Sequence, residues 1–192
     1  PTGTPVSLET IEAAYDATEG IVMGDEAYVE FRPEGSPTAS ELLPGRERLV
    51  VSRTMSKAFA FAGARVGYLL ADPAVVDALR LVRLPYHLSG ITQAAALGAL
   101  QHSDVMLSMV SDIRNQRDRL LRELPKLGFT VCASEANFVL FGGIDDPPQL
   151  FRDLLERDIL IRDVGIDGHL RVTAGTEDET TVFLETLARL RA

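Results

Sequence analysis

VSRTMSKAFAFAGARVG, residues 51–67, places a lysine among small and aromatic apolar side chains in a chain whose other cations are almost all arginines. The second lysine, Lys126, lies far away in the sequence. An ammonium group beside Phe59 and Phe61 is expected to lose hydration, which lowers its pKa toward that of a usable neutral amine. A neutral amine can attack an aldehyde, so the stretch predicts a nucleophilic lysine at Lys57.

Hydroxyl groups and an arginine flank this lysine. Ser52, Thr54 and Ser56 come before it, and Arg65 follows it just before an apolar run. A guanidinium offers a fork of charged donors and each hydroxyl adds one more, which is the chemistry that holds a phosphate dianion. The stretch therefore predicts an amine and a phosphate site close together.

An acidic and an aromatic residue follow an upstream apolar run. The run at residues 21–24 ends at Asp25, and Tyr28 comes three residues later. Open α/β sheets bind ligands at the carboxyl ends of their strands, where a carboxylate can keep a pyridine nitrogen protonated and a phenol can bond a ring oxygen. Taken singly, these residues are most often ordinary solvated side chains. Together with Lys57 and the phosphate site, they match the four polar groups of pyridoxal phosphate: its aldehyde, its phosphate, its ring nitrogen and its ring oxygen.

The hydrophobic pattern predicts two structural regions. Apolar runs are predicted as buried strands of a sheet covered on both faces, and later segments with three-to-four spacing as helices. From residue 128 onward, short strands and two helices are predicted to form a compact α+β unit. The class is therefore α/β, with one domain at 1–88 and a second at 89–192. The predicted strands are 21–24, 49–51, 66–71, 129–133, 137–141, 159–162 and 169–173; the predicted helices are 74–84, 92–100, 104–127, 148–157 and 177–190, besides one capped by Ser7.

Composition excludes several classes of function. A formal charge of −9 over 192 residues argues against binding a nucleic-acid backbone. No apolar run approaches the length needed to span a bilayer, and the single cysteine permits no intrachain disulfide, so we expect a cytoplasmic protein. The three histidines lack metal-binding spacing, and no metal site is predicted.

The stretch around Lys57, preceded by Asp25-Glu26-Ala27-Tyr28, closely resembles the cofactor-lysine region of fold-type I pyridoxal-phosphate-dependent aminotransferases. In detail it resembles the histidinol-phosphate aminotransferases. Residues 1–4 resemble the end of a further family motif, and residues 136–138 and 170–173 resemble later signatures. The resemblance implies a fold-type I architecture, here the C-terminal part of the large domain with the small domain.

The resemblance also assigns roles. It implies that Lys57 joins the cofactor covalently and then carries a proton, that Asp25 pairs with the ring nitrogen, and that Tyr28 bonds the ring oxygen. Thr54, Ser56 and Arg65 would hold the phosphate. Arg171 would take the carboxylate of the amino-acid or 2-oxo-acid substrate, and Arg162 resembles a position that contacts the phosphate of histidinol phosphate. For Arg171 an ordinary surface ion pair, and for Arg162 a position without substrate contact, stay open as alternatives.

Members of this family are about twice as long as this chain, so the resemblance implies a C-terminal half that needs the missing N-terminal half. It also implies a homodimer for the complete enzyme, and an isolated fragment without activity. Three functions follow as hypotheses. They are transamination between L-histidinol phosphate and 2-oxoglutarate in histidine biosynthesis, transamination of an aromatic amino acid such as phenylalanine, and a non-catalytic fragment of the same fold.

Overall fold

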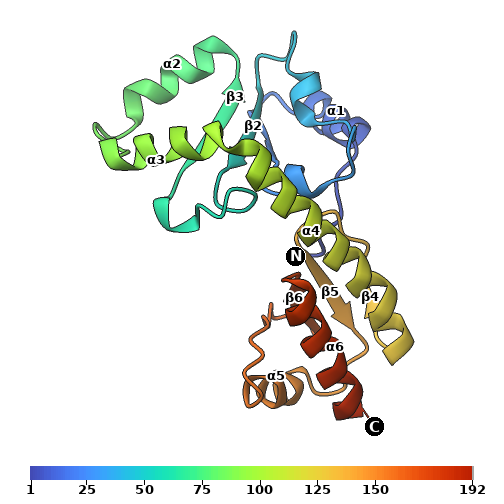
Figure 1. Ribbon diagram of the computed structural model, residues 1–192. Helices are drawn as coiled ribbons and strands as arrows, with labels where there is room; N and C mark the ends of the chain where they lie inside the picture. Colours follow the sequence, from blue (N-terminus) through green and yellow to red (C-terminus); the bar gives the residue numbers. More distant parts are fainter. Residues whose placement is uncertain (192) are drawn as a thin grey trace. The chain divides into compact units, whose positions relative to one another are not determined.

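The computed structural model describes residues 1–191, which divide into two compact units (Figure 1). The first, here the Lys57 unit, comprises Val6–Met109. The second, here the Arg171 unit, comprises Pro1–Pro5 and the chain from Val110 onward. The boundary predicted after residue 88 lies in the turn before a helix, whereas the division falls inside helix α4, Ser103–Glu123. An unbroken helix offers no change of pattern at that point, so the sequence did not signal it.

A three-stranded sheet forms the centre of the Lys57 unit. Strand β1 (Val22–Asp25) pairs in parallel with β2 (Leu49–Thr54), which pairs antiparallel with β3 (Gly67–Ala71). The sheet is therefore mixed, which agrees with the predicted α/β class. Parallel neighbours are usually joined through an α-helix that crosses over the sheet, whereas residues 55–66 between β2 and β3 form a loop without an α-helix, so β3 returns antiparallel.

Helices of this unit begin at residues suited to capping. The Ser7 hydroxyl accepts a hydrogen bond from the Thr10 amide at 3.2 Å and caps α1 (Leu8–Asp16), as predicted. Asp72 caps α2 (Pro73–Val82), and Ser89 caps α3 (Gly90–Gln101). Short 3-10 helices complete the unit: η1 (Val29–Phe31), η2 (Ala39–Leu42) and η3 (Ala62–Ala64).

The Arg171 unit is an antiparallel sheet packed against helices. Its strand order is β4 (Thr130–Val131), β5 (Phe138–Gly142) and β6 (His169–Thr173), and α6 (Glu177–Arg191) lies beside the sheet in Figure 1. Helix α5 (Pro147–Leu155), the end of α4 and the following η4 (Leu124–Leu127) complete its core. The buried side chains at the centre of this core include Phe141, Leu154, Leu170 and Leu187.

One predicted strand is absent from this unit. Residues 159–162 form only an isolated bridge, in which Arg162 pairs with Arg171. Leu160 is 76% exposed, whereas Ile161 is buried. The apolar run therefore belongs to an irregular segment that places one side chain in the core and the next in solvent. Among residues 1–191, no helix combines the length and the apolar character that crossing a bilayer requires.

Candidate functional site

Asp25 lies at the carboxyl end of β1, as predicted. In the parallel register it stands opposite Ser52 of β2. Its Oδ1 accepts hydrogen bonds from the Ala27 amide at 3.0 Å and from the Ser52 hydroxyl at 3.4 Å. The described residues give Oδ2 no hydrogen bond, and the side chain is exposed. Asp25 is thus a fixed carboxylate with one free oxygen at the strand end where ligands bind.

Lys57 and Tyr28 meet although they come from different segments. The Lys57 ammonium lies 5.6 Å from the centre of the Tyr28 ring, within the range of a cation–π interaction. The prediction of desolvation was wrong, because Lys57 is exposed. Its flanking apolar residues Met55 and Ala58 are buried at 4% and 6% exposure and anchor the loop, while the lysine points outward. The apolar neighbours of Lys57 therefore indicate that the loop is anchored in the core, and they do not indicate the environment of the amine.

The predicted phosphate residues differ in how free their polar groups are. The Thr54 hydroxyl donates to the Val66 carbonyl at 3.3 Å and accepts from the Ser56 amide at 3.1 Å, so it shapes the loop. The Ser56 hydroxyl makes no hydrogen bond within the described residues. Arg65 is exposed, with a left-handed φ of 56° and one hydrogen bond to the Ala62 carbonyl at 3.0 Å. Ser56 and Arg65 therefore keep donors available for an anion.

An ion pair that the sequence analysis did not identify joins the two segments. Arg53 donates to Glu26 Oε2 from Nε at 2.9 Å and from Nη2 at 2.7 Å. Burial by itself would lower the pKa of Arg53, but the hydrogen bond and charge of Glu26, with a contribution from Tyr68, hold this pKa above its usual value. The sequence alone did not indicate this pair, because the pairing of β1 with β2 brings the two residues together.

Glu30 lies beside this pair. Burial raises the pKa of its carboxyl; its backbone hydrogen bond and the charge of Arg53 oppose the shift, and the charge of Glu26 adds to it. Its Oε2 is buried without a hydrogen-bond partner among the described residues. Glu30 is therefore a carboxyl whose burial favours its protonated form, close enough to Arg53 and Glu26 to sense their charges.

Arg171 and Arg162 lie in the other unit. They pair through their backbones, Arg162 N to Arg171 O at 2.9 Å and Arg171 N to Arg162 O at 2.8 Å. The Arg171 guanidinium stacks 4.4 Å above the centre of the Phe138 ring, and its Nε is buried without a hydrogen-bond partner in residues 1–191. A buried donor without a partner costs free energy, which an anion bound at Arg171 would recover. Arg162 is exposed.

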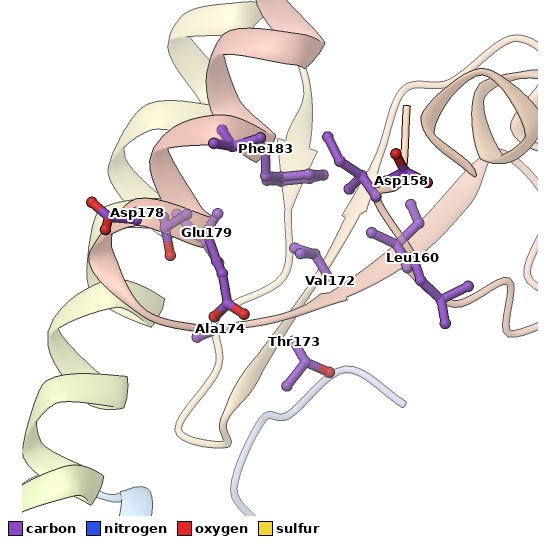
Figure 2. A pocket seen from close by; sticks show the side chains of 14 residues that line it. Asp158, Leu160, Val172, Thr173, Ala174, Asp178, Glu179 and Phe183 are labelled. Atoms are coloured by element: carbon purple, nitrogen blue, oxygen red, sulfur yellow. The ribbon is translucent and has the colours of Figure 1, made fainter. Parts of the chain in front are cut away.

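The Arg171 unit also has an open pocket of about 500 Å³. Figure 2 shows Val172 and Phe183 in its wall, with Asp158 on one side and Asp178 and Glu179 on the other. None of the predicted site residues lines it. Its acidic rim would repel a phosphate or a dicarboxylate, so it does not suit the anionic substrates that the arginines favour.

Comparison with known proteins shows what this chain is similar to. A family model described as aminotransferase class I and II matches residues 1–187. The histidinol-phosphate aminotransferase of Paenarthrobacter aurescens is 59% identical over 193 residues, covering 99% of this chain and 52% of the relative. That of Frankia casuarinae is 55% identical, covering 98% of this chain and 49% of the relative.

Solved structures show the same fold. The histidinol-phosphate aminotransferase from Clostridium acetobutylicum matches with a TM-score of 0.90 at 26% identity, covering 100% of this chain and 61% of its own. The enzyme from Sinorhizobium meliloti, in complex with pyridoxal-5′-phosphate, matches with a TM-score of 0.84 at 27% identity, covering 100% of this chain and 55% of its own. These matches confirm the predicted fold-type I class.

The chain spans about half the length of the curated relatives it matches. The expectation of a C-terminal half does not hold as stated, because the coverage establishes a match to about half of each relative and assigns it to neither end. What the comparisons support is the coarser statement, a partial length of a histidinol-phosphate-aminotransferase-like chain.

Proposed function

The chain belongs to the class I and II aminotransferases, and from this membership we propose that it is part of an enzyme that transfers an amino group between L-histidinol phosphate and 2-oxoglutarate, with pyridoxal 5′-phosphate as cofactor. The observation that carries the proposal is the position of Lys57 over Tyr28, in the unit that also holds Asp25 at a strand end. The choice of substrate is supported by relatives at 50–59% identity that bear this name.

The residues of the Lys57 unit fit this cofactor. Asp25 offers a carboxylate oxygen without a partner among the described residues, Lys57 an exposed amine, and Arg65 an exposed cation. Ser56 adds a hydroxyl without a hydrogen bond in this structure. When bound, the cofactor supplies an electron sink for the electron pair left behind when a proton leaves the substrate carbon. Asp25 would hold the ring nitrogen protonated, and Arg65 with Ser56 would neutralise and orient the phosphate.

Lys57 would have two tasks, to hold the cofactor covalently and to move a proton between two carbons of the substrate and cofactor. Its position over the Tyr28 ring suits both, because the cation–π contact restrains an otherwise flexible side chain and leaves its nitrogen exposed. The hydroxyl of Tyr28 would donate a hydrogen bond to the ring oxygen of the cofactor, and its ring would orient the Lys57 side chain.

For the substrates, we propose Arg171 as the residue that binds the carboxylate of glutamate or 2-oxoglutarate. The buried Nε without a partner and the stacking of its guanidinium on Phe138 support this role. The ring contact restrains the guanidinium, which is a planar fork of donors that matches a carboxylate, and the Nε still lacks an acceptor among the described residues. For Arg162 we propose the phosphate of histidinol phosphate, supported by its exposure next to Arg171.

We also propose that the complete enzyme is a homodimer and that this chain is inactive without the rest of the protein. Large apolar side chains near the turn between α2 and α3 support this: Leu81 is 87% exposed, Tyr86 is 99% exposed and Ile91 is 85% exposed. Large apolar side chains exposed to this extent are expected to be covered by protein. A cytoplasmic location stays a prediction from the sequence.

The proposal is tested by incubating the complete protein that contains this chain with pyridoxal phosphate, reducing it with borohydride and mapping the adduct. We expect one adduct, on Lys57 and not on Lys126. Transamination is then assayed with histidinol phosphate and with phenylalanine as amino donors. A higher kcat/KM for histidinol phosphate supports the proposal; a preference for phenylalanine would favour the aromatic enzyme, and no adduct would favour a non-catalytic fragment.

A further inference from the structure

Glu26 and Arg53 connect the two segments that carry the proposed cofactor site. Glu26 lies between Asp25 and Tyr28, and Arg53 directly precedes Thr54 in the strand that leads to Lys57. Arg53 donates two hydrogen bonds to one carboxylate oxygen of Glu26, at 2.9 and 2.7 Å. A displacement of either segment would stretch both charge-assisted hydrogen bonds at once.

The other polar atoms of Glu26 are also engaged. Its Oε1 accepts a hydrogen bond from the Ala39 amide at 2.6 Å, and its backbone amide donates to the Ser52 carbonyl at 2.9 Å. The side chains of Glu26 and Arg53 are only 11% and 20% exposed. Solvent therefore screens this ion pair weakly, and its geometry is fixed by three different segments of the Lys57 unit.

The loop that carries Lys57 starts from a tightly packed base. A Cβ added at Gly67 would lie 2.8 Å from the Arg53 carbonyl oxygen, so β3 approaches β2 as closely as a glycine permits. The Met55 amide donates to the Val66 carbonyl at 3.1 Å, and the Met55 side chain is buried. With so little room at this base, we expect a displacement of Arg53 to shift the loop that carries Lys57 as well.

The charges of the pair depend on each other. The pKa of Arg53 lies above its usual value in spite of burial, because Glu26 compensates its charge. Glu30 has a raised pKa, owing first to its burial, and the Arg53 hydrogen bonds go to Glu26, whereas Glu30 Oε2 has no partner among the described residues. Removing Glu26 would leave a largely buried cation without its main partner, which is strongly unfavourable.

We propose that Glu26 and Arg53 are positioning residues that set Lys57 over Tyr28 by locking the Asp25–Tyr28 segment to the base of the Lys57 loop. Neither residue is assigned a contact with the cofactor or the substrate. The inference rests on the proposed function for its chemical consequence, but the locking of the two segments is a property of the protein alone.

The locking is tested without cofactor by hydrogen exchange of the complete protein that contains this chain. In Glu26→Gln and in Arg53→Lys, we expect the amides of residues 54–61 to exchange at least about tenfold faster. Arg53→Lys retains the charge but loses the fork, so it keeps the test valid if Glu26→Gln does not fold. The matched control is Glu12→Gln, which breaks the Glu12–Arg46 ion pair of the same unit; it should leave residues 54–61 unchanged.

The chemical consequence is tested by the visible absorbance of the lysine-bound cofactor as a function of pH. A residue that only supports folding would lower the melting temperature and leave the midpoint of this titration in place. For Glu26→Gln and Arg53→Lys we expect the midpoint to shift and kcat to fall more than KM rises, whereas Glu12→Gln should titrate like the unaltered protein.

The outcomes separate the two proposals. Faster exchange at residues 54–61 in the two variants and not in the control supports the locking, whatever the cofactor result. Exchange unchanged in both variants would overturn it. Absence of a cofactor adduct on Lys57 in the unaltered protein would instead contradict the proposed function and leave the exchange result as the test of the locking.

Discussion

The ammonium group of Lys57 lies 5.6 Å from the centre of the Tyr28 ring, and this contact joins the segment after β1 to the loop after β2. The two strands are parallel neighbours, so their carboxyl ends lie at one edge of the sheet. A lysine that has to reach a cofactor aldehyde needs a restrained direction and an exposed nitrogen, and the ring provides the first without removing the second.

Replacing this amine removes the proposed chemistry. In the complete enzyme, Lys57→Ala should lower transamination by at least about a thousandfold, since both covalent binding and proton transfer depend on the amine. The reaction is followed by the consumption of histidinol phosphate. Lys126→Ala is the control, because Lys126 is exposed and its ammonium pairs with Glu123 at 2.8 Å, away from the Lys57 loop in sequence. Normal turnover in Lys57→Ala would contradict the assignment.

Asp25 is expected to act through its charge. Asp25→Asn retains a hydrogen-bond acceptor but cannot stabilise a protonated ring nitrogen, so the Kd for pyridoxal phosphate should rise by about tenfold to a hundredfold. Equilibrium dialysis measures this change. Asp16→Asn, an exposed carboxylate at the end of α1, should bind the cofactor like the unaltered protein. Equal Kd values for both variants would exclude the role.

The two arginines of the other unit should affect different substrates. Arg171→Lys keeps the charge but loses the fork of donors, so the KM for 2-oxoglutarate should rise by about tenfold. Arg162→Ala should instead raise the KM for histidinol phosphate. Steady-state kinetics with each substrate varied in turn distinguishes the two. The reverse pattern would exchange the assignments, and no change in either KM would remove both residues from the substrate site.

The core of the Arg171 unit depends on an aromatic cluster. The Phe141 ring is fully buried and packs edge-on against two other rings. Its centre lies 5.3 Å from the centre of the Phe129 ring and 6.1 Å from that of the Phe183 ring. Phe141→Ala should lower the free energy of unfolding of this unit by about 3 to 5 kcal/mol. Urea unfolding followed by circular dichroism measures the loss. Val182→Ala, at a half-exposed position of α6, should stay within about 0.5 kcal/mol of the unaltered protein.

Glu30 should make stability depend on pH. Its pKa in the folded state is raised, chiefly by burial. The folded protein then binds this proton more tightly than the unfolded chain, so stability is greatest below the usual pKa and falls as pH rises through the folded-state pKa. Glu30→Gln should flatten this fall and raise the melting temperature at neutral pH. Exposed Glu34→Gln is the control, and a melting temperature lowered by Glu30→Gln would contradict the prediction.

The candidate site could be predicted in part. Asp25 is found where the sequence places it, because an apolar run that ends in a carboxylate marks a strand end whatever the strand pairs with. The exposure of Lys57 could not be predicted from its apolar neighbours, because they alternate between the core and the surface within one loop. The Glu26–Arg53 pair could not be predicted, because it joins residues that only strand pairing brings together.

The sequence by itself determined the local features of this protein. Ser7 caps a helix, the runs before Asp25 and Ser52 form strands, and the motif around Lys57 resembles that of the family to which the chain belongs. Each depends on residues close together in the chain, so a local pattern suffices. Only the tertiary structure decided that β3 runs antiparallel, that residues 159–162 form no strand, and that Lys57 lies over Tyr28. These features depend on which distant segments pack together, a choice made by the free energy of the whole fold.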